Sequence, residues 1–485
     1  MNIRKALQVT LALGLALAVM ITPSATKQAW AQAGLPALCT GFQLQNTDTG
    51  NSATVNLSFY NVSGGNNNGT PDYSPAAISI PASGSTSKYV PSAYSTLPSG
   101  SYSIVVSSDR QLNSLVNQVD CSTGGLNVGA SYSGISSTNT GNTVYLAFVM
   151  SRAFGAQNWS SAIAIQNAGS NPASSVQIQF FRSGQATAVE TFTTSNLTVG
   201  DTWYLDLSTG QYASANLANF SGAAKITSTG VPVAVVTNYA PGDGSRILSY
   251  NGVTSGGQKL YATQVSRNYA AGQYQGGLSL YNLGGTSTPI QIDFYAAGSA
   301  VPVHSLTTSV GGDSTYSLYM GPGGPLDGVA AMSSFNGSAV VQVTSGSNNL
   351  VGIFNLNSAV GAAGAANMMP ATQATLSVTF PQIVRSIGSG PFEAGWQIVN
   401  TTGTTANLTI KYVKSDGTVT QSNTTLGGNS ALSTYVGGSA GAPLGTGWNG
   451  SLVVTSDQPI VGQANFINLG AGAKDSLLIY NGFNN

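Results

Sequence analysis

The sequence predicts an all-β protein made of four tandem immunoglobulin-like β-sandwich domains that follow a cleaved signal peptide. The first observation is a repeated motif that ends in asparagine and returns every 115 to 120 residues or so (FQLQN, IAIQN, LSLYN and WQIVN, at 42–46, 163–167, 278–282 and 396–400). The second is the strict alternation of apolar and polar residues in runs such as 176–180 and 290–294, which is typical of strands. The third is that no window beyond the N-terminal region has a helical period.

The length of the repeat decides the domain organisation. Solenoid and propeller units are roughly 20–50 residues long, whereas an immunoglobulin-like sandwich takes roughly 100 residues. We therefore place domain boundaries at 34–140, 141–256, 257–370 and 371–485 and expect the domains to form a rod. The glycine- and alanine-rich stretch 361–369 replaces a closing Ser-Tyr-Asn-Gly motif in the third repeat, so we expect a flexible hinge there.

The N-terminal region has the features of an export signal. Arg4 and Lys5 precede an apolar run from residue 6 to residue 21, and small residues at 29, 31 and 33 have the spacing of a cleavage site. We expect residues 1–33 to be a signal peptide and the mature chain to be extracellular or on the cell surface. A retained membrane anchor is the alternative, although the run is short of the roughly 20 apolar residues that span a bilayer.

The first repeat differs from the others in three ways. It contains both cysteines, Cys39 and Cys121, which we expect to form a disulfide in an exported protein. It carries an insertion rich in glycine and asparagine at 64–72. It also lacks an opening strand, because cleavage near Ala33 leaves too few residues before the central strand. A sandwich without that strand has an open edge, which can accept a strand from another chain.

Charge is unusually scarce. Charged residues make up 6% of the chain and the net charge is zero, whereas about 25% is ordinary. There is no basic footprint for nucleic acid. A neutral surface lacks the repulsion that keeps copies apart, so it suits self-association or a coat of sugar. The alternative is simply an export product with few charges.

The sequence contains few residues that could form a catalytic or metal-binding site. His304 is the single histidine, and Glu190 and Glu393 are the only glutamates, so we expect no enzyme. We expect no cofactor, since isolated acids near glycines are usually turn residues. A structural calcium ion is the alternative, and three groups of oxygen atoms are its candidate ligands: Asp48 with Asn51, Asp243 with Asp201 or Asp206, and Asp313 with Asp327.

Aromatic residues offer one possible binding surface. Trp159 and Trp448 stand near predicted loops, where they could stack on glycans, whereas Trp396 lies within a predicted core strand. The alternative for both loop tryptophans is packing over the core.

Several runs of the second repeat resemble a known kind of protein. The runs YLAFVMSR, NWSSAIAIQNAGS, VQIQFF and SYNGV, clearest within 144–253, resemble a tandem sandwich repeat of secreted surface proteins of Chloroflexota-type filamentous bacteria. The resemblance covers nearly the whole mature chain and implies an exported envelope component.

The functional expectation follows from these features. We expect a structural cell-surface protein that self-assembles into a filament, sheath or surface layer through strand addition at the first domain. The alternative is a monomeric adhesin or a carbohydrate-binding surface protein. The expected partners are copies of the chain and cell-envelope glycans, without nucleic acid and without membrane insertion after signal cleavage.

Overall fold

The computed structural model describes residues 38–62, 69–121, 128–270, 273–359, 361–387, 391–415, 417–469 and 477–484. The predicted signal peptide, 1–33, lies outside these residues. The described chain consists mainly of strands, so the all-β prediction is confirmed. No helix among the described residues is long and apolar enough to cross a membrane.

The strands fall into four units that follow the four sequence repeats. Unit one contains β1 (Leu38–Asn46), β2 (Ala53–Asn61), β3 (Ile78–Ile80), β4 (Ser85–Tyr89), the short helix α1 (Val90–Ala93), β5 (Tyr102–Ser108), β6 (Leu112–Asp120) and β7 (Gly129–Ser133). Unit two contains β8 (Thr143–Ser151), β9 (Ser160–Asn167), β10 (Ala173–Arg182), β11 (Glu190–Leu197), β12 (Thr202–Asp206), β13 (Phe220–Thr229), β14 (Val233–Ala240) and β15 (Leu248–Asn251).

Units three and four repeat the same order of strands. Unit three contains β16 (Lys259–Arg267), β17 (Gln275–Asn282), β18 (Thr288–Ala296), β19 (His304–Val310), β20 (Thr315–Tyr319), β21 (Phe335–Val343), β22 (Leu350–Asn357), β23 (Ala363–Asn367) and the short β24 (Met369–Pro370). Unit four contains β25 (Thr375–Ile387), β26 (Phe392–Asn400), β27 (Ala406–Lys414), β28 (Val419–Leu426), β29 (Ala431–Tyr435), β30 (Trp448–Asn468), β31 (Leu477–Asn481) and β32 (Phe483–Asn484).

Each unit is a sandwich, but its strand order is not that of an immunoglobulin domain. In unit two the sheet β11-β10-β13-β8 faces the sheet β12-β9-β14-β15, whereas an immunoglobulin constant domain has the orders A-B-E-D and C-F-G. Val176, Ile178 and Phe180 of β10 point into the core and are fully buried, as their alternation with Gln177 and Gln179 predicts. In unit four the long strand β30 runs through both layers and joins them into one eight-stranded sheet.

The asparagine that ends each repeat motif has a clear structural role. The Nδ2 of Asn167 donates to the carbonyl oxygens of Asn171 (2.9 Å) and Leu197 (2.8 Å), and its Oδ1 accepts from the N–H of Gly169 (2.8 Å). The side chain therefore ties the turn after β9 to the end of β11 and satisfies backbone groups away from water. The matching asparagines of the other units bond their own turns in the same way and are also fully buried: Asn46, Asn282 and Asn400.

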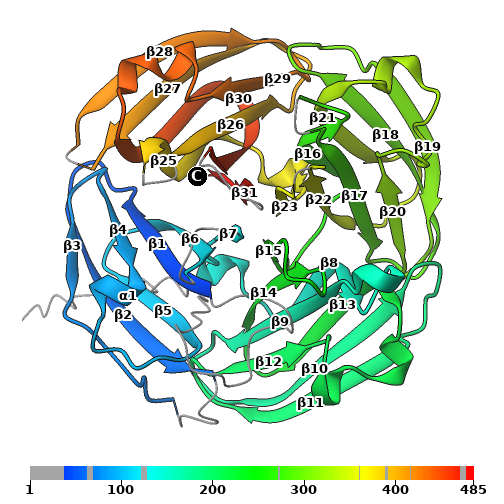
Figure 1. Ribbon diagram of the computed structural model, residues 1–485, viewed down its shortest axis with the longest axis horizontal. Coiled ribbons are helices and arrows are strands. Elements are labelled where there is room, and N and C mark those ends of the chain that lie inside the picture. The colour runs from blue at the N-terminus through cyan, green and yellow to red at the C-terminus, as the bar shows by residue number, and fades with distance from the viewer. Residues whose placement is uncertain are drawn as a thin grey trace, which may run out of the picture.

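The four units form a closed ring rather than the expected rod (Figure 1). The opening strand β8 of unit two lies against β17 and β22 of unit three, and β16 of unit three lies against β26 and β30 of unit four. The opening strand β25 of unit four lies against β1 and β6 of unit one, which closes the circle. Sequence patterns report contacts within a repeat, and the angle between successive repeats is set by contacts that no local pattern encodes.

The inner strands β7, β15, β23 and β31 meet at the centre of the ring, each beside the next (Figure 1). The expected hinge at 361–369 is therefore wrong, because most of it forms β23, whose residues 363–366 are buried. Its small residues permit close contact. A Cβ on Gly364 would come 2.6 Å from the Cγ1 of Ile479 in β31.

Among the described residues of unit one, no strand takes the place of the opening strand. The outer sheet of unit one has the order β3-β2-β5, where the outer sheet of unit two has four strands. Residues just before and within the insertion lie at the boundary with unit two. Val62 packs against Ala162, Ala164 and Tyr204, and a Cβ on Gly69 would lie 3.6 Å from the Cβ of Val199.

The predicted disulfide between Cys39 and Cys121 is present and joins the start of β1 to the residue after β6. A disulfide of this kind indicates an oxidising, non-cytoplasmic environment.

Candidate binding pocket on the ring axis

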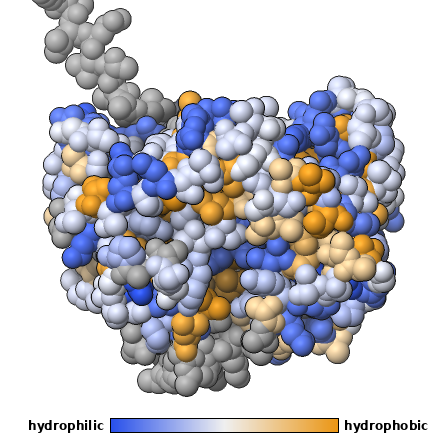
Figure 2. All heavy atoms as spheres, turned by 90° about the horizontal axis from the view of Figure 1, so that it is seen from above, coloured by the Kyte–Doolittle hydropathy of each residue, from blue (hydrophilic) through white to orange (hydrophobic). Residues whose placement is uncertain are grey.

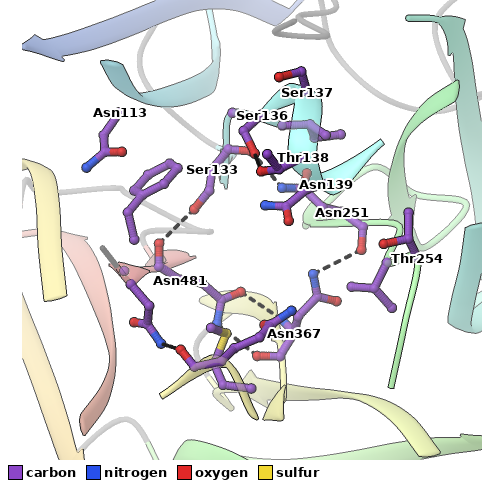
Figure 3. Close-up of a pocket in the computed structure, with 18 of the residues that line it drawn as sticks. Asn113, Ser133, Ser136, Ser137, Thr138, Asn139, Asn251, Thr254, Asn367 and Asn481 are labelled. Carbon is purple, nitrogen blue, oxygen red and sulfur yellow. Dashed lines mark hydrogen bonds between the residues drawn. The ribbon is translucent and has the colours of Figure 1, made fainter. Parts of the chain in front are cut away.

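The inner strands of the four units end at the same level on the ring axis with Ser133, Asn251, Asn367 and Asn481. Each asparagine Nδ2 donates to the backbone carbonyl oxygen of the preceding unit: Asn251 to Ser133 (2.6 Å), Asn367 to Asn251 (3.0 Å) and Asn481 to Asn367 (2.8 Å). The Oγ of Ser133 donates to the carbonyl oxygen of Asn481 (2.7 Å) and completes the circle. We call these four residues the axial ring (Figure 3).

The residues around Asn251 show how its part of the axial ring is held in place. The tyrosine before it points into its own unit, and the hydroxyl of Tyr250 bonds the carbonyl oxygen of Phe148. Burial raises the pKa of Tyr250 well above its ordinary value, so the hydroxyl stays neutral and donates. The glycine after it permits close approach, since a Cβ on Gly252 would come 2.5 Å from the Cγ1 of Val144 in β8.

A cavity of about 590 Å³ lies at the axial ring. This volume is within the range of small-molecule sites, about 300–1,000 Å³. Amides and hydroxyls from all four units surround it (Figure 3), and the residues that line it include Asn113, Ser136, Thr138, Asn139, Thr254 and the axial ring. Met369 and Phe483 add apolar surface to the same wall.

The axis is closed next to the pocket. Each inner strand has a buried side chain two residues before its axial-ring residue, with at most 2% of its surface exposed: Ser131, Ser249, Ala365 and Ile479. These side chains close one end of the cavity.

Asn113 is the most informative residue of the wall. Its side chain is 3% exposed, and its Nδ2 has no hydrogen-bond partner among the described residues. Gln45, which lies directly opposite on β1, has an Oε1 that is likewise without a partner there. Buried amide atoms are nearly always bonded, and leaving one unpaired costs about 1–3 kcal/mol. The pocket wall thus offers a buried donor, the Nδ2 of Asn113.

The pocket is close to neutral. Its lining includes one acid and one base, Asp109 and Arg110, which both belong to the turn between β5 and β6. Arg110 pairs with Asp48 at 3.3 Å, and Asp109 Oδ1 accepts from the N–H of Thr54 at 2.7 Å. Each charge already has a partner in unit one, so the pocket suits an uncharged polar ligand.

The two tryptophans expected to stack on a ligand lie elsewhere. Trp448 is 7% exposed and packs edge-to-face on Tyr412 at 5.9 Å, so its ring has no open face and the expectation of a stacking role is not supported. Trp159 is half-buried against Tyr239, and its indole N–H donates to Gln157 Oε1 at 3.1 Å. Neither residue lines the pocket. A short polar loop in sequence does not distinguish an exposed tryptophan from one that covers a core.

Two of the acids considered for calcium, Asp327 and Asp48, are engaged in other contacts. Asp327 pairs with Arg267, and Asp48 accepts the backbone N–H groups of Gly50 and Asn51, which lower its pKa. Within the described ranges, no three acidic, histidine or cysteine side chains gather as a metal site would need. His304 stacks on Phe294 and also lies outside the pocket.

The sequence signal for the axial ring is the closing motif of each repeat, which by itself predicts only a turn. Tyr-Asn-Gly ends units two and four, whereas Tyr132–Ser133–Gly134 and Ala366–Asn367–Met368 stand at the same place in units one and three. The pattern marks the end of an inner strand. That four such ends meet follows only from closure of the ring.

No family model and no curated protein matches the chain. Among solved structures, Thermotoga maritima 1070 is 17% identical over 23% of this chain and 94% of that chain, with a TM-score of 0.20. The Anabaena sensory rhodopsin transducer is 19% identical over 19% of this chain and 96% of its own, with a TM-score of 0.17. A tetra-tandem repeat from the extending region of a large adhesion protein is 15% identical over 96% and 99%, with a TM-score of 0.11. Similarities this weak carry no argument about function.

Proposed function

We propose that the protein is an exported cell-surface protein that binds a neutral, hydroxyl-rich ligand, such as the end of a glycan, in the axial pocket. The observation that carries this proposal is the buried and unpaired amide of Asn113 in the pocket wall. A sugar hydroxyl both donates and accepts, so it can bond the Nδ2 of Asn113 and remove the cost of leaving it unpaired.

Two further features support this proposal. The axial ring holds the surrounding strand ends through a closed set of hydrogen bonds, and a preorganised site loses less entropy on binding. The shortage of charge favours a neutral ligand over a phosphate or a nucleic acid. We also propose that the protein is not an enzyme, because the described pocket lining contains no histidine, glutamate, lysine or cysteine.

The test is calorimetry of the chain from Gly34 onward against a panel of neutral mono- and oligosaccharides, after a glycan-array screen. We expect Asn113→Ala to weaken binding about tenfold or more, since a lost hydrogen bond to a buried amide is worth about 1–3 kcal/mol. Trp159→Ala is the matched control and should bind normally. Binding that survives Asn113→Ala but is lost in Trp159→Ala would move the site to the loop before β9.

A second candidate is a structural protein that assembles into a filament, sheath or surface layer by strand addition at unit one. The observation that favours it is the edge of β5. Ser101 O and Asp109 N bond the β2 side, so the backbone groups of Ile104 and Val106 point to the other side, where no described strand pairs. The side view shows hydrophobic residues dispersed among polar ones (Figure 2), and charged residues make up 6% of the chain, so few charges oppose contact.

Electron microscopy of the native cell surface beside the recombinant chain tests this second candidate. Ordered filaments or lattices would support assembly, whereas isolated rings at high concentration would refute it. The proposal includes residues 1–33 as a cleaved signal peptide and four sandwich domains at 34–140, 141–256, 257–370 and 371–485.

A further inference from the structure

The four interfaces of the ring are not joined in the same way. Short linkers connect units one and two, two and three, and three and four. Units four and one are adjacent only through non-covalent contacts, and the disulfide Cys39–Cys121 lies within unit one. We call the contact of β25 with β1 and β6 the closing interface.

The closing interface is held largely by amides. Gln43 Nε2 donates to the carbonyl oxygen of Pro381, and Asn117 Nδ2 donates to Gln382 Oε1 at 2.9 Å. Leu115 of β6 is fully buried and joins the core cluster of unit four. Amide groups that part can bond water instead, so a polar interface opens at a lower cost than an apolar one.

The interface between units three and four also contains amide bonds, since Gln264 Oε1 accepts from Gln463 Nε2 at 2.6 Å and from Asn465 Nδ2 at 3.1 Å, together with an apolar cluster. Its cluster contains Tyr261, Val340, Val399 and Val461, all at most 5% exposed. Between units two and three, Tyr281 packs on the rings of Tyr145 and Phe181. All three interfaces combine polar and apolar contacts, and the closing interface is the one that no linker holds together.

We infer that the closing interface opens and reforms between copies, with unit four of one chain docking on unit one of the next. Such an exchange reuses contacts that already exist, which is why swapping is a low-cost route to assembly. The same heterologous contact closes a ring within one chain and propagates as an open head-to-tail chain between chains. Zero net charge removes the general repulsion that would oppose it. This inference does not depend on ligand binding in the pocket.

The test uses the double variant Ser87→Cys/Asn449→Cys. Asn449 Nδ2 lies 3.5 Å from Ser87 Oγ across the closing interface, within reach of a short bismaleimide crosslinker. The native cysteines are bonded to each other and do not react. The chain is held at high concentration just below its melting temperature, cooled and crosslinked. We expect a ladder of dimers, trimers and longer products on a denaturing gel.

The matched control is Gln264→Cys/Asn465→Cys across the interface between units three and four, where Asn465 Nδ2 lies 3.1 Å from Gln264 Oε1. This pair should give internally linked monomers only. Monomers from both pairs would overturn the inference, and so would equal ladders from both, which would indicate random collision. Light scattering on the unmodified chain must show the same growth in mass, so that a folding defect of the variant is not mistaken for assembly.

Discussion

Units one and two differ in one strand, and that difference shows what the strand does. In unit two, β8 pairs with β13 and also lies against unit three, so it completes one sandwich and forms the contact with the next. In unit one no described strand takes this place, and β5 is paired by β2 alone. Val62, just before the insertion, and Gly69, within it, lie against unit two instead. The opening strand is therefore the connector of the ring.

The ends of the opening strands reinforce this comparison. Each is followed or ended by an arginine that donates to backbone carbonyls of a loop in its own unit, a role suited to the several donors of a guanidinium. The pairs are Arg152 with Ser214, Arg267 with Met320 and Arg385 with Gly441. Three of the 15 basic residues thus hold loops in units two, three and four.

The largest expected effect comes from removing that disulfide. The sequence separation is 82 residues, so Cys39→Ala/Cys121→Ala should lower the free energy of unfolding by about 4–5 kcal/mol in the chain-entropy model. Urea denaturation gives the size of the effect, and hydrogen exchange should show the loss in β1 and β6 first. Equal loss of protection in β9 and β14 would show that unit one does not depend on it more than unit two.

In unit two, a substitution in the opening strand β8 tests how much that strand stabilises the unit. Leu146 of β8 is fully buried in the core, so Leu146→Ala should cost about 3–4 kcal/mol of unfolding free energy. The exposed Ser174→Ala in β10 serves as the control and should change stability by less than about 0.5 kcal/mol. A cost below 1 kcal/mol for Leu146→Ala would mean that β8 contributes little to the unit.

A smaller effect should follow from Asn167→Ala. The change removes three hydrogen bonds and leaves the carbonyl of Leu197 unpaired, which should cost about 2–3 kcal/mol. Asn171→Ala, whose exposed side chain bonds only Ser170 Oγ at 3.5 Å, should be neutral. Similar melting temperatures for the two variants would contradict the role assigned to the repeated asparagine.

The contact that replaces the missing strand can be tested with Val62→Ala. Val62 is half-buried against Ala162, Ala164 and Tyr204, so we expect a loss of about 1 kcal/mol. Calorimetry of the intact chain measures it. An unchanged transition would show that residues near the insertion do not stabilise the boundary between units one and two.

Alkaline pH should weaken both units. Burial raises the pKa of Tyr94 in unit one to about 12 and that of Tyr250 in unit two well above its ordinary value. A raised tyrosine pKa means that the folded state favours the neutral form. This contribution is complete below pH 10 and is lost as the pH rises through the folded-state pKa. Melting temperatures should therefore be nearly flat from pH 6 to 9 and fall above pH 10. A fall that begins near pH 8 would point to another group.

The sequence by itself determined the features that depend on neighbouring residues. Alternation specified the strands, and the repeated motif specified the turn that Asn167 holds. These two results are local because the side-chain period of a strand and the chemistry of a turn are set within a few residues. The Cys39–Cys121 pairing is not local, and it followed from there being two cysteines in the sequence.

Three features depend on the tertiary structure alone: the closed circle of four units, the axial ring of four hydrogen-bonded residues, and the pocket. Asn251 meets Ser133, and Asn367 meets Asn481, across more than a hundred residues each, and no pattern within one repeat specifies such a contact. The same applies to Trp448, which looks like a loop residue in sequence but is buried against Tyr412. The angle between successive units arises from the packing of β8, β16 and β25 on the inner sheet of the next unit, and from the contacts of Val62 between units one and two. Together these four interfaces return the chain to its start, and this closure brings four strand ends together around one cavity.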